Sequence, residues 1–200
     1  DELKKIVKVD TMKKLSKDKL SLEIFSLIFP EFKNIIFFSK LNVSKEEILK
    51  KNDFIFLLSL MIIDETDNAD YFLYRFNISK KNQKRIQIIN NFFKDTINSK
   101  PFTEREMNKI FYYNGKQAVI DILNFKIIKS NKLDKTLTEL IEKYKNKKIP
   151  IMPIGAETLM TKYKIPEGRQ LGAKLKIIEE EWVNNNFQIS DTKLENIINN

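Results

Sequence analysis

Apolar side chains recur every three or four residues along most of the chain. This spacing predicts a succession of helices that each bury one face. One helix is expected to run from near the start to Leu15, and Ser16 is placed to cap a second one. A third is expected over Pro30–Leu41, since a proline is well tolerated at a first helical position. The second helix would carry four aliphatic side chains on one face: Leu20, Ile24, Leu27 and Ile28.

Polar residues mark where later helices begin. The segments Ser44–Glu47 and Thr103–Glu106 both have the capping-box pattern, in which the first and last side chains satisfy free backbone N–H groups. The helix that follows Thr103 is expected to end near Gly115. Asp53 is placed to cap the longest apolar run, residues 54–63, which fits a buried helix and is too short to cross a membrane.

The remaining segments follow the same pattern. We expect a short apolar element over residues 71–79, a basic helix over 80–93, a break at Pro101, and helices over 116–130, 133–147 and 191–200. No stretch alternates apolar and polar residues for long enough to require a strand, and no Asn-Gly or Asp-Gly hairpin signal occurs. The sequence therefore predicts an all-α fold, an irregular multi-helix array.

The charge balance changes this picture by suggesting a partner. The chain has 36 Lys and Arg residues against 27 Asp and Glu residues, a formal charge of +9 and a pI near 9.4. Such an excess is typical of proteins that bind polyanions. A general abundance of Lys, Asn and Ile in the source genome is the alternative explanation. The first residues lack the apolar core of a secretory signal, so a cytoplasmic location is expected.

Candidate catalytic groups are scarce. Cysteine and histidine are absent, which excludes disulfides, thiolate chemistry and the commonest general base and metal ligand. No phosphate-binding glycine loop, dinucleotide fingerprint or nucleophile elbow occurs. Carboxylates gather at residues 64–70 and again at 179–181, where we expect solvated surface charges rather than ligands for two metal ions. We therefore predict no catalytic residue and no metal ligand.

Two groups of basic residues favour binding to RNA phosphates. The first group lies at the start of the expected basic helix, where several cations share a face: Lys80, Lys81, Lys84 and Arg85. An ordinary solvated helix face is the alternative. The second group surrounds the backbone motif of Gly155, Gly168 and Gly172. Its members are Lys162, Lys164, Arg169 and Lys174.

The glycines of the second group have two interpretations. They place backbone N–H groups at a helix N-terminus, where a phosphate is bound favourably. Alternatively, Gly168 and Gly172 let the helix pack closely on another one, with Leu171, Leu175, Ile178 and Trp182 as the buried stripe. The two interpretations are compatible. The surrounding segment, residues 149–187, holds three of the four glycines, three of the five prolines and the only tryptophan.

This segment carries a resemblance to a known family. Residues 150–159, residues 165–172, Leu175 and Trp182 resemble the C-terminal motif of bacterial CCA-adding tRNA nucleotidyltransferases and the related poly(A) polymerases. That motif has a Pro, then Gly-x-Asp-Leu, Gly-x-x-Pro-Gly-x-x-x-Gly, Leu and Trp. Residues 15–23 are similar to the neck motif of the family, and residues 75–85 are similar to its body segment. The resemblance therefore spans nearly the whole chain.

The resemblance implies a division into three parts: neck helices at 1–28, a helical body at 29–148, and a helical tail with the Gly/Pro-rich motif at 149–200. In this family a catalytic head precedes the neck and holds two Mg²⁺ ions on an Asp-x-Asp pair, while a further motif of the head reads CTP or ATP. These head motifs do not occur in the chain, so it looks like neck, body and tail alone. Magnesium, CTP and ATP are expected only with the head.

The resemblance further implies that the chain binds tRNA and positions its acceptor arm and elbow for 3′-end addition by a separate or missing head. A separate nucleotidyltransferase head chain is therefore an expected partner, alongside tRNA. The chain alone is expected to be inactive. CCA addition and poly(A) addition stay open as alternatives, because the residues that discriminate them lie outside the sequence. A non-catalytic helical protein-interaction module is a third possibility.

Overall fold

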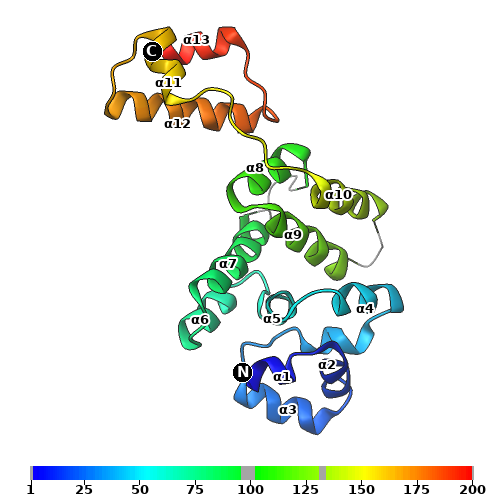
Figure 1. Cartoon of the computed structure of the whole chain (residues 1–200). Helices are drawn as coiled ribbons and strands as arrows, with labels where there is room; N and C mark the ends of the chain where they lie inside the picture. Colours follow the sequence, from blue (N-terminus) through cyan, green and yellow to red (C-terminus); the bar gives the residue numbers. More distant parts are fainter. Residues whose placement is uncertain (1, 96–101, 131–133, 200) are drawn as a thin grey trace. The chain divides into compact units, whose positions relative to one another are not determined.

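The computed structural model describes residues 2–95, 102–130 and 134–199. Within these ranges the chain forms helices and no strand, which confirms the predicted all-α fold (Figure 1). The first helices in chain order are α1 (Glu2–Ile6), α2 (Val9–Leu15), α3 (Lys19–Ile28), the 3-10 helix η1 (Ile35–Lys40), α4 (Val43–Lys50), α5 (Phe54–Ile62) and α6 (Asn68–Arg75). The others are α7 (Lys80–Asp95), α8 (Glu104–Asn114), α9 (Lys116–Lys129), α10 (Lys135–Asn146), α11 (Ala156–Tyr163), α12 (Arg169–Asn184) and α13 (Asp191–Asn199).

The chain divides into two compact units. The first unit comprises Asp1–Lys100 and Ile120–Glu142, and the second comprises Pro101–Val119 and Lys143–Asn200. Helices α9 and α10 each contribute residues to both units. The neck, body and tail division is drawn from motifs rather than from compactness, and it stays a prediction.

Helix α5 forms the core of the first unit. Every residue from Ile55 to Ile62 is buried, including Ser59, whose hydroxyl donates to the Ile55 carbonyl 2.8 Å away. Burying an aliphatic side chain of this size contributes about 1.5–3 kcal/mol, so this one helix supplies much of the driving force for the unit. Asp53 caps it as predicted, with Oδ1 accepting from the Phe56 N–H at 3.0 Å.

A chain of phenylalanines connects α3 to α6 in the same unit. The ring centroids of Phe25 and Phe29 lie 4.9 Å apart, those of Phe29 and Phe32 lie 5.2 Å apart, and those of Phe72 and Phe76 lie 4.5 Å apart. Phe32 bridges the two groups, with its ring 5.6 Å from that of Phe72. Aromatic pairs at these separations add about 0.5–1.5 kcal/mol each beyond the area they bury.

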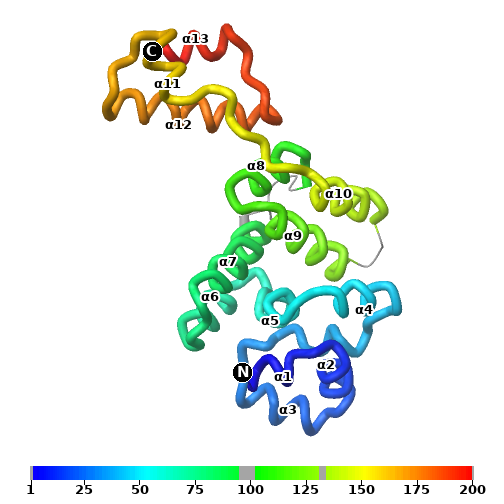
Figure 2. Tube along the Cα trace, viewed as in Figure 1, coloured from blue at the N-terminus to red at the C-terminus, as the bar shows by residue number. Residues whose placement is uncertain are grey.

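The second unit is built around α12. Its buried residues Leu171 and Ile178 form one hydrophobic cluster with Leu159 of α11, Leu194 of α13, and Ile165 in the connection between α11 and α12. Figure 2 traces these three helices and the short connections between them. The predicted buried stripe is therefore correct, with Leu175 partly buried against the same cluster and Trp182 buried.

Helix α8 also packs on α12 in the second unit. The Trp182 ring lies 5.4 Å from that of Tyr112 and 5.0 Å from that of Phe187. The two ends of α8 follow the sequence prediction. The Thr103 hydroxyl accepts from the Glu106 N–H, and Gly115 ends the helix with a φ of 81°, a value that favours glycine.

Two predicted helix starts are wrong. Ser16 does not cap α3, because its hydroxyl donates to the Lys13 carbonyl at the end of α2 and Asp18 accepts from the Ser21 N–H instead. Asn42 rather than Ser44 caps α4, with Oδ1 2.9 Å from the Lys45 nitrogen. In each case another polar residue, two positions away, takes the capping role.

The segment expected as one helix over Pro30–Leu41 is helical only in its second half, as η1, and its first half is irregular. Asn34 explains the difference, because its side-chain amide donates to the carbonyls of Leu60 and Ile63, 3.1 and 2.8 Å away. These bonds fix the segment to the end of α5 and satisfy carbonyls that the α5 helix leaves free. The opening helix is likewise divided, into α1 and α2. The break predicted at Pro101 and the helix start at residue 133 lie outside the described residues.

The aliphatic stripe of α3 faces solvent. Leu20, Ile24, Leu27 and Ile28 are all exposed, and Leu27 is 83% exposed. Phe25 is the buried residue of this helix. An exposed stripe of this kind is unusual on a soluble chain, because contiguous apolar surface generally marks a contact with another molecule.

Glu46 of α4 joins two lysines and gives a pH-dependent test of the first unit. Its carboxylate accepts from Lys13 of α2 and lies 2.8 Å from Lys50 Nζ, and these two hydrogen bonds lower the pKa of Glu46 from 4.5 to about 2. A lowered pKa stabilises the fold above the unfolded value, and this contribution is lost as the pH falls through the folded value.

We therefore expect Glu46→Gln to lower the melting temperature at pH 7, and we expect the difference from the unchanged chain to narrow as the pH falls from 4.5 toward about 2. Thermal melts followed by circular dichroism between pH 7 and pH 2 measure this difference. Glu47→Gln, at an exposed neighbouring position, serves as the control and should change little. A deficit of Glu46→Gln that is the same at every pH would contradict the assignment.

Candidate nucleic-acid interface

The start of α7 presents a cluster of lysines to solvent. Lys80, Lys81 and Lys84 are exposed, and none of them forms an ion pair with another described residue. Lys80 and Lys84 lie one helical turn apart on the same side of α7. By contrast, Lys94 at the other end of the helix binds Asp67 and Asp70, each at 2.8 Å. The positive charge at the start of α7 is therefore available to an external anion.

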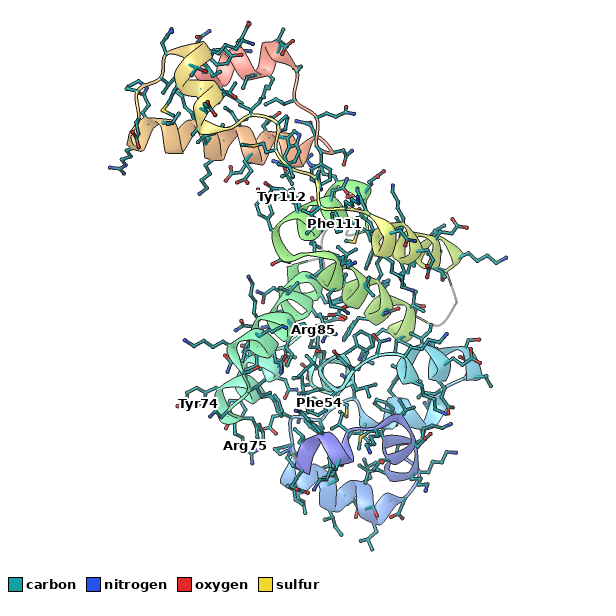
Figure 3. All side chains as sticks on the ribbon, in the orientation of Figure 1. Phe54, Tyr74, Arg75, Arg85, Phe111 and Tyr112 are labelled. Atoms are coloured by element: carbon teal, nitrogen blue, oxygen red, sulfur yellow. The ribbon has the colours of Figure 1, made fainter. Side chains whose placement is uncertain are left out.

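Arg85 does not share this exposed surface. Its side chain is 19% exposed, and Nε and Nη2 donate to the two carboxylate oxygens of Asp121 at 2.6 and 3.0 Å. Nη1 donates to Asp53, whose other oxygen caps α5. Figure 3 labels Arg85 on α7, among other side chains of the first unit. The structure thus brings together three of the four predicted cations and directs the fourth inward.

The electrostatics of Arg85 favour this inward arrangement. Burial alone would lower the pKa of Arg85, but its hydrogen bonds to Asp121 and Asp53 outweigh burial and raise that pKa above its ordinary value. Asp121 is fully buried, so its carboxylate depends on hydrogen bonds within the protein. This role could not be predicted from the sequence, because Arg85 follows several solvated lysines and Asp121 is far from it along the chain.

The glycine motif lies in the second unit, where two of its members precede helices. Gly155 precedes α11 and has ordinary extended backbone, while Gly168 precedes α12 with a φ of 145°. This φ lies in a region that side chains other than glycine rarely adopt. No side chain caps the first turn of α12. Its backbone N–H groups therefore face the surface without a side-chain acceptor, next to the exposed Arg169.

Gly172 lies on the exposed side of α12. A Cβ atom placed there would meet no atom within 4 Å, and the same holds for Gly168. Close packing against another described helix therefore does not require glycine at either position. The lack of a side chain leaves the backbone of α12 open to a close approach from outside.

The basic residues around the glycine motif have different environments. Lys162 is exposed, with Nζ 5.2 Å from the ring centroid of Tyr163, and Lys164 ends α11 in the left-handed conformation with a φ of 58°. Lys174 is only 7% exposed, and its ammonium donates to the Ile197 and Ile198 carbonyls near the end of α13, at 3.1 and 2.7 Å. Lys174 thus fastens α13 to α12, a role that the sequence analysis missed.

Several carboxylates of both acidic segments have partners within the protein. Asp64 accepts from Thr66, and Asp67 and Asp70 bind Lys94. Glu179 accepts from the Tyr112 hydroxyl at 2.7 Å, and burial together with this bond raises the pKa of Tyr112 to about 12. Within the described ranges, no three acidic side chains converge in a way that would hold a metal ion. No described helix is both long and apolar enough to span a membrane.

Comparison with known proteins gives one family. The model of the family described as tRNA nucleotidyltransferase domain 2 matches residues 47–198. This match extends from within α4 into α13 and includes both the lysines of α7 and the glycine motif. The chain therefore belongs to the tRNA nucleotidyltransferase domain 2 family, in agreement with the resemblance found in its motifs. Searches of the curated proteins and of the solved structures found no match.

The inward role of Arg85 predicts a large effect on stability. Arg85→Met should remove the guanidinium that binds both Asp121 and Asp53, and breaking a buried ion pair by removing one member costs about 3–5 kcal/mol in similar cases. Urea unfolding curves measure this loss. The matched control is Lys84→Met, one position away on the exposed surface, which should change the free energy of unfolding by less than about 0.5 kcal/mol.

A second variant separates ion pairing from packing. Combining Arg85→Met with Asp121→Leu removes both charges, so it should recover part of the lost stability. Equal effects of Arg85→Met and Lys84→Met would show that the buried ion pair is not what holds α7 in place.

Proposed function

We propose that this chain is the RNA-binding helical part of a tRNA nucleotidyltransferase and positions the acceptor arm and elbow of tRNA for 3′-end addition by a head domain. The observation that carries this proposal is the group of three exposed lysines at the start of α7, within the part of the chain that matches the family. A family that acts on tRNA requires a surface for a polyanion, and no described carboxylate forms an ion pair with this group.

The mechanism is positioning by phosphate contacts. Lysines on one helix face neutralise several backbone phosphates, and the release of counterions from the RNA supplies much of the binding free energy. Such contacts fix the register of the RNA without reading its sequence. Holding a 3′ end near an active site makes a bimolecular step effectively unimolecular, and this is how a part without catalytic groups accelerates a reaction.

The N-terminus of α12 supports a further phosphate contact in the second unit. Its first N–H groups lack a side-chain cap, Gly168 and Gly172 leave the backbone uncovered, and Arg169 adds a positive charge. The helix dipole favours an anion at this end. We assign this surface to the tRNA backbone, with Lys162 and Lys164 as flanking cations.

The exposed stripe of α3 favours a second candidate function, a helical protein-interaction module. Its four aliphatic side chains offer apolar surface to another protein, whereas the lysines of α7 offer none. The two functions are compatible if the partner is a nucleotidyltransferase head. Mixing the chain with a head-bearing fragment, and measuring incorporation of CTP and ATP into tRNA that lacks its 3′ end, tests the complete proposal and separates CCA addition from poly(A) addition.

Salt dependence tests the α7 surface. Replacing Lys80, Lys81 and Lys84 together by Gln should weaken tRNA binding. It should also reduce the slope of log K against log salt by roughly 2 to 3, because each phosphate contact contributes about 0.9 to this slope for B-DNA, a value that we apply to duplex RNA. Filter binding from 50 to 200 mM salt measures both effects, because three phosphate contacts change the affinity by about 40-fold over this range.

The control for this experiment changes the net charge equally. Lys8, Lys14 and Lys17 are also exposed and form no ion pair with a described residue, so their joint replacement by Gln removes the same charge from another surface. Equal losses from the two triple variants would show that net charge alone, rather than the α7 surface, attracts the RNA.

Gly172 tests the backbone contact at α12. Glycine within a helix costs about 0.5–1 kcal/mol relative to alanine, so Gly172→Ala should raise the stability of the chain by that amount, since the new methyl group meets no atom. If phosphate approaches the backbone there, the same variant should bind tRNA more weakly. A more stable variant with unchanged tRNA affinity would remove Gly172 from the interface.

A further inference from the structure

Helix α6 presents two tyrosines to solvent, Tyr71 and Tyr74. Neither side chain belongs to the hydrophobic core or to the lysine cluster at the start of α7. Tyr74 is 91% exposed and Tyr71 is 61% exposed. They are three residues apart, so they lie on the same side of the helix. Neither hydroxyl bonds to another described residue. Figure 3 shows Tyr74 directed away from the helical body.

The pairing of α6 with α7 places Tyr74 near the lysines. The two helices run antiparallel, because Asp70 lies 3.4 Å from the Asn90 side-chain nitrogen while Asp67 lies 2.8 Å from Lys94 Nζ. In this register Tyr74 lies level with Gln87. Lys84 is then about one helical turn away and Lys80 about two turns away, roughly 5 and 11 Å along the axis.

The charge around Tyr74 is complementary to a nucleic acid. Lys80 and Lys84 form no ion pair with a described residue, whereas the nearby carboxylates of Asp67 and Asp70 are neutralised by Lys94. Arg75, the next residue, forms a 2.7 Å ion pair with Glu31 within the protein. An exposed aromatic ring beside free cations is the arrangement that binds single-stranded nucleic acids by stacking and phosphate contacts together.

We propose that Tyr74, with Tyr71 beside it, stacks on an unpaired RNA base whose flanking phosphates bind Lys84 and Lys80. Bases within a duplex have their faces covered by neighbouring pairs, so an exposed ring selects unpaired nucleotides. This inference rests on the proposed function, because it assumes that the start of α7 binds RNA phosphates. It adds that the same surface distinguishes unpaired from paired RNA.

Three substitutions in the 200-residue chain test the stacking contact. Tyr74→Leu removes the ring but keeps an apolar side chain, and Tyr74→Phe keeps the ring and removes only the hydroxyl. Tyr113→Leu is the matched control, because Tyr113 is another exposed tyrosine, 51% exposed, that lies outside the proposed surface. Thermal melts check that all three variants fold, as expected for exposed positions.

Two RNA probes separate stacking from charge: a short single strand that carries one 2-aminopurine, and a blunt duplex of the same length. Stacking of one base on an aromatic side chain corresponds to about 5- to 150-fold in affinity. We expect Tyr74→Leu to lose affinity for the single strand within this range and to bind the duplex within about twofold of the unchanged chain. Tyr74→Phe and Tyr113→Leu should bind both RNAs like the unchanged chain. The 2-aminopurine fluorescence should be quenched by every form except Tyr74→Leu.

The outcomes distinguish the stacking contact of Tyr74 from the phosphate contacts of the lysines. If the unchanged chain binds both RNAs and Tyr74→Leu binds the single strand equally well, the stacking site is overturned while the phosphate surface stands. If the unchanged chain binds neither RNA at low salt, the proposed function fails and the stacking site fails with it. A loss that Tyr74→Leu shows equally on the duplex would also overturn base stacking, since a duplex offers no free base face along its length.

Discussion

The hydrogen bonds from Arg85 to Asp121 and Asp53 determine the arrangement of the first unit around α7. They connect three helices, because Asp53 caps α5, Arg85 belongs to α7 and Asp121 belongs to α9. A fully buried carboxylate tolerates little movement of its counter-charge, so these bonds fix the rotation of α7 about its axis. That rotation turns Lys80 and Lys84 outward. The candidate RNA surface therefore depends on a buried interaction that itself contacts no RNA.

Local features of the fold were predictable from the sequence. Two helices begin as expected at Asp53 and Thr103, and one ends as expected at Gly115, because each of these residues acts on backbone groups a few residues away. The all-α class followed from the spacing of apolar residues for the same reason. Pro30 misled the prediction because its own conformation suits a helix start, whereas distant carbonyls at the end of α5 hold the following segment through Asn34.

The roles of individual cations were harder to predict than their existence. Lys84 and Arg85 are neighbours in a basic sequence, yet one is solvated and the other is buried against a carboxylate 36 residues away. Lys174 was predicted to bind phosphate and instead donates to backbone carbonyls of α13. Sequence spacing shows which side chains share a helix face, but it does not show what lies opposite that face.

The ammonium of Lys174 has a consequence for the C-terminal end of the described chain. Its acceptors are main-chain oxygens of Ile197 and Ile198, so they disappear whenever the last turn of α13 is removed, whatever residues form that turn. A chain cleaved just before Ile197 by a protease would keep the buried residues of the hydrophobic cluster, lose the two partly buried isoleucines that pack against them, and leave the Lys174 cation enclosed beside the cluster. Loss of the last turn of α13 therefore removes the acceptors of Lys174 as well as the apolar contacts of Ile197 and Ile198, so it is more damaging than the loss of those side-chain contacts alone.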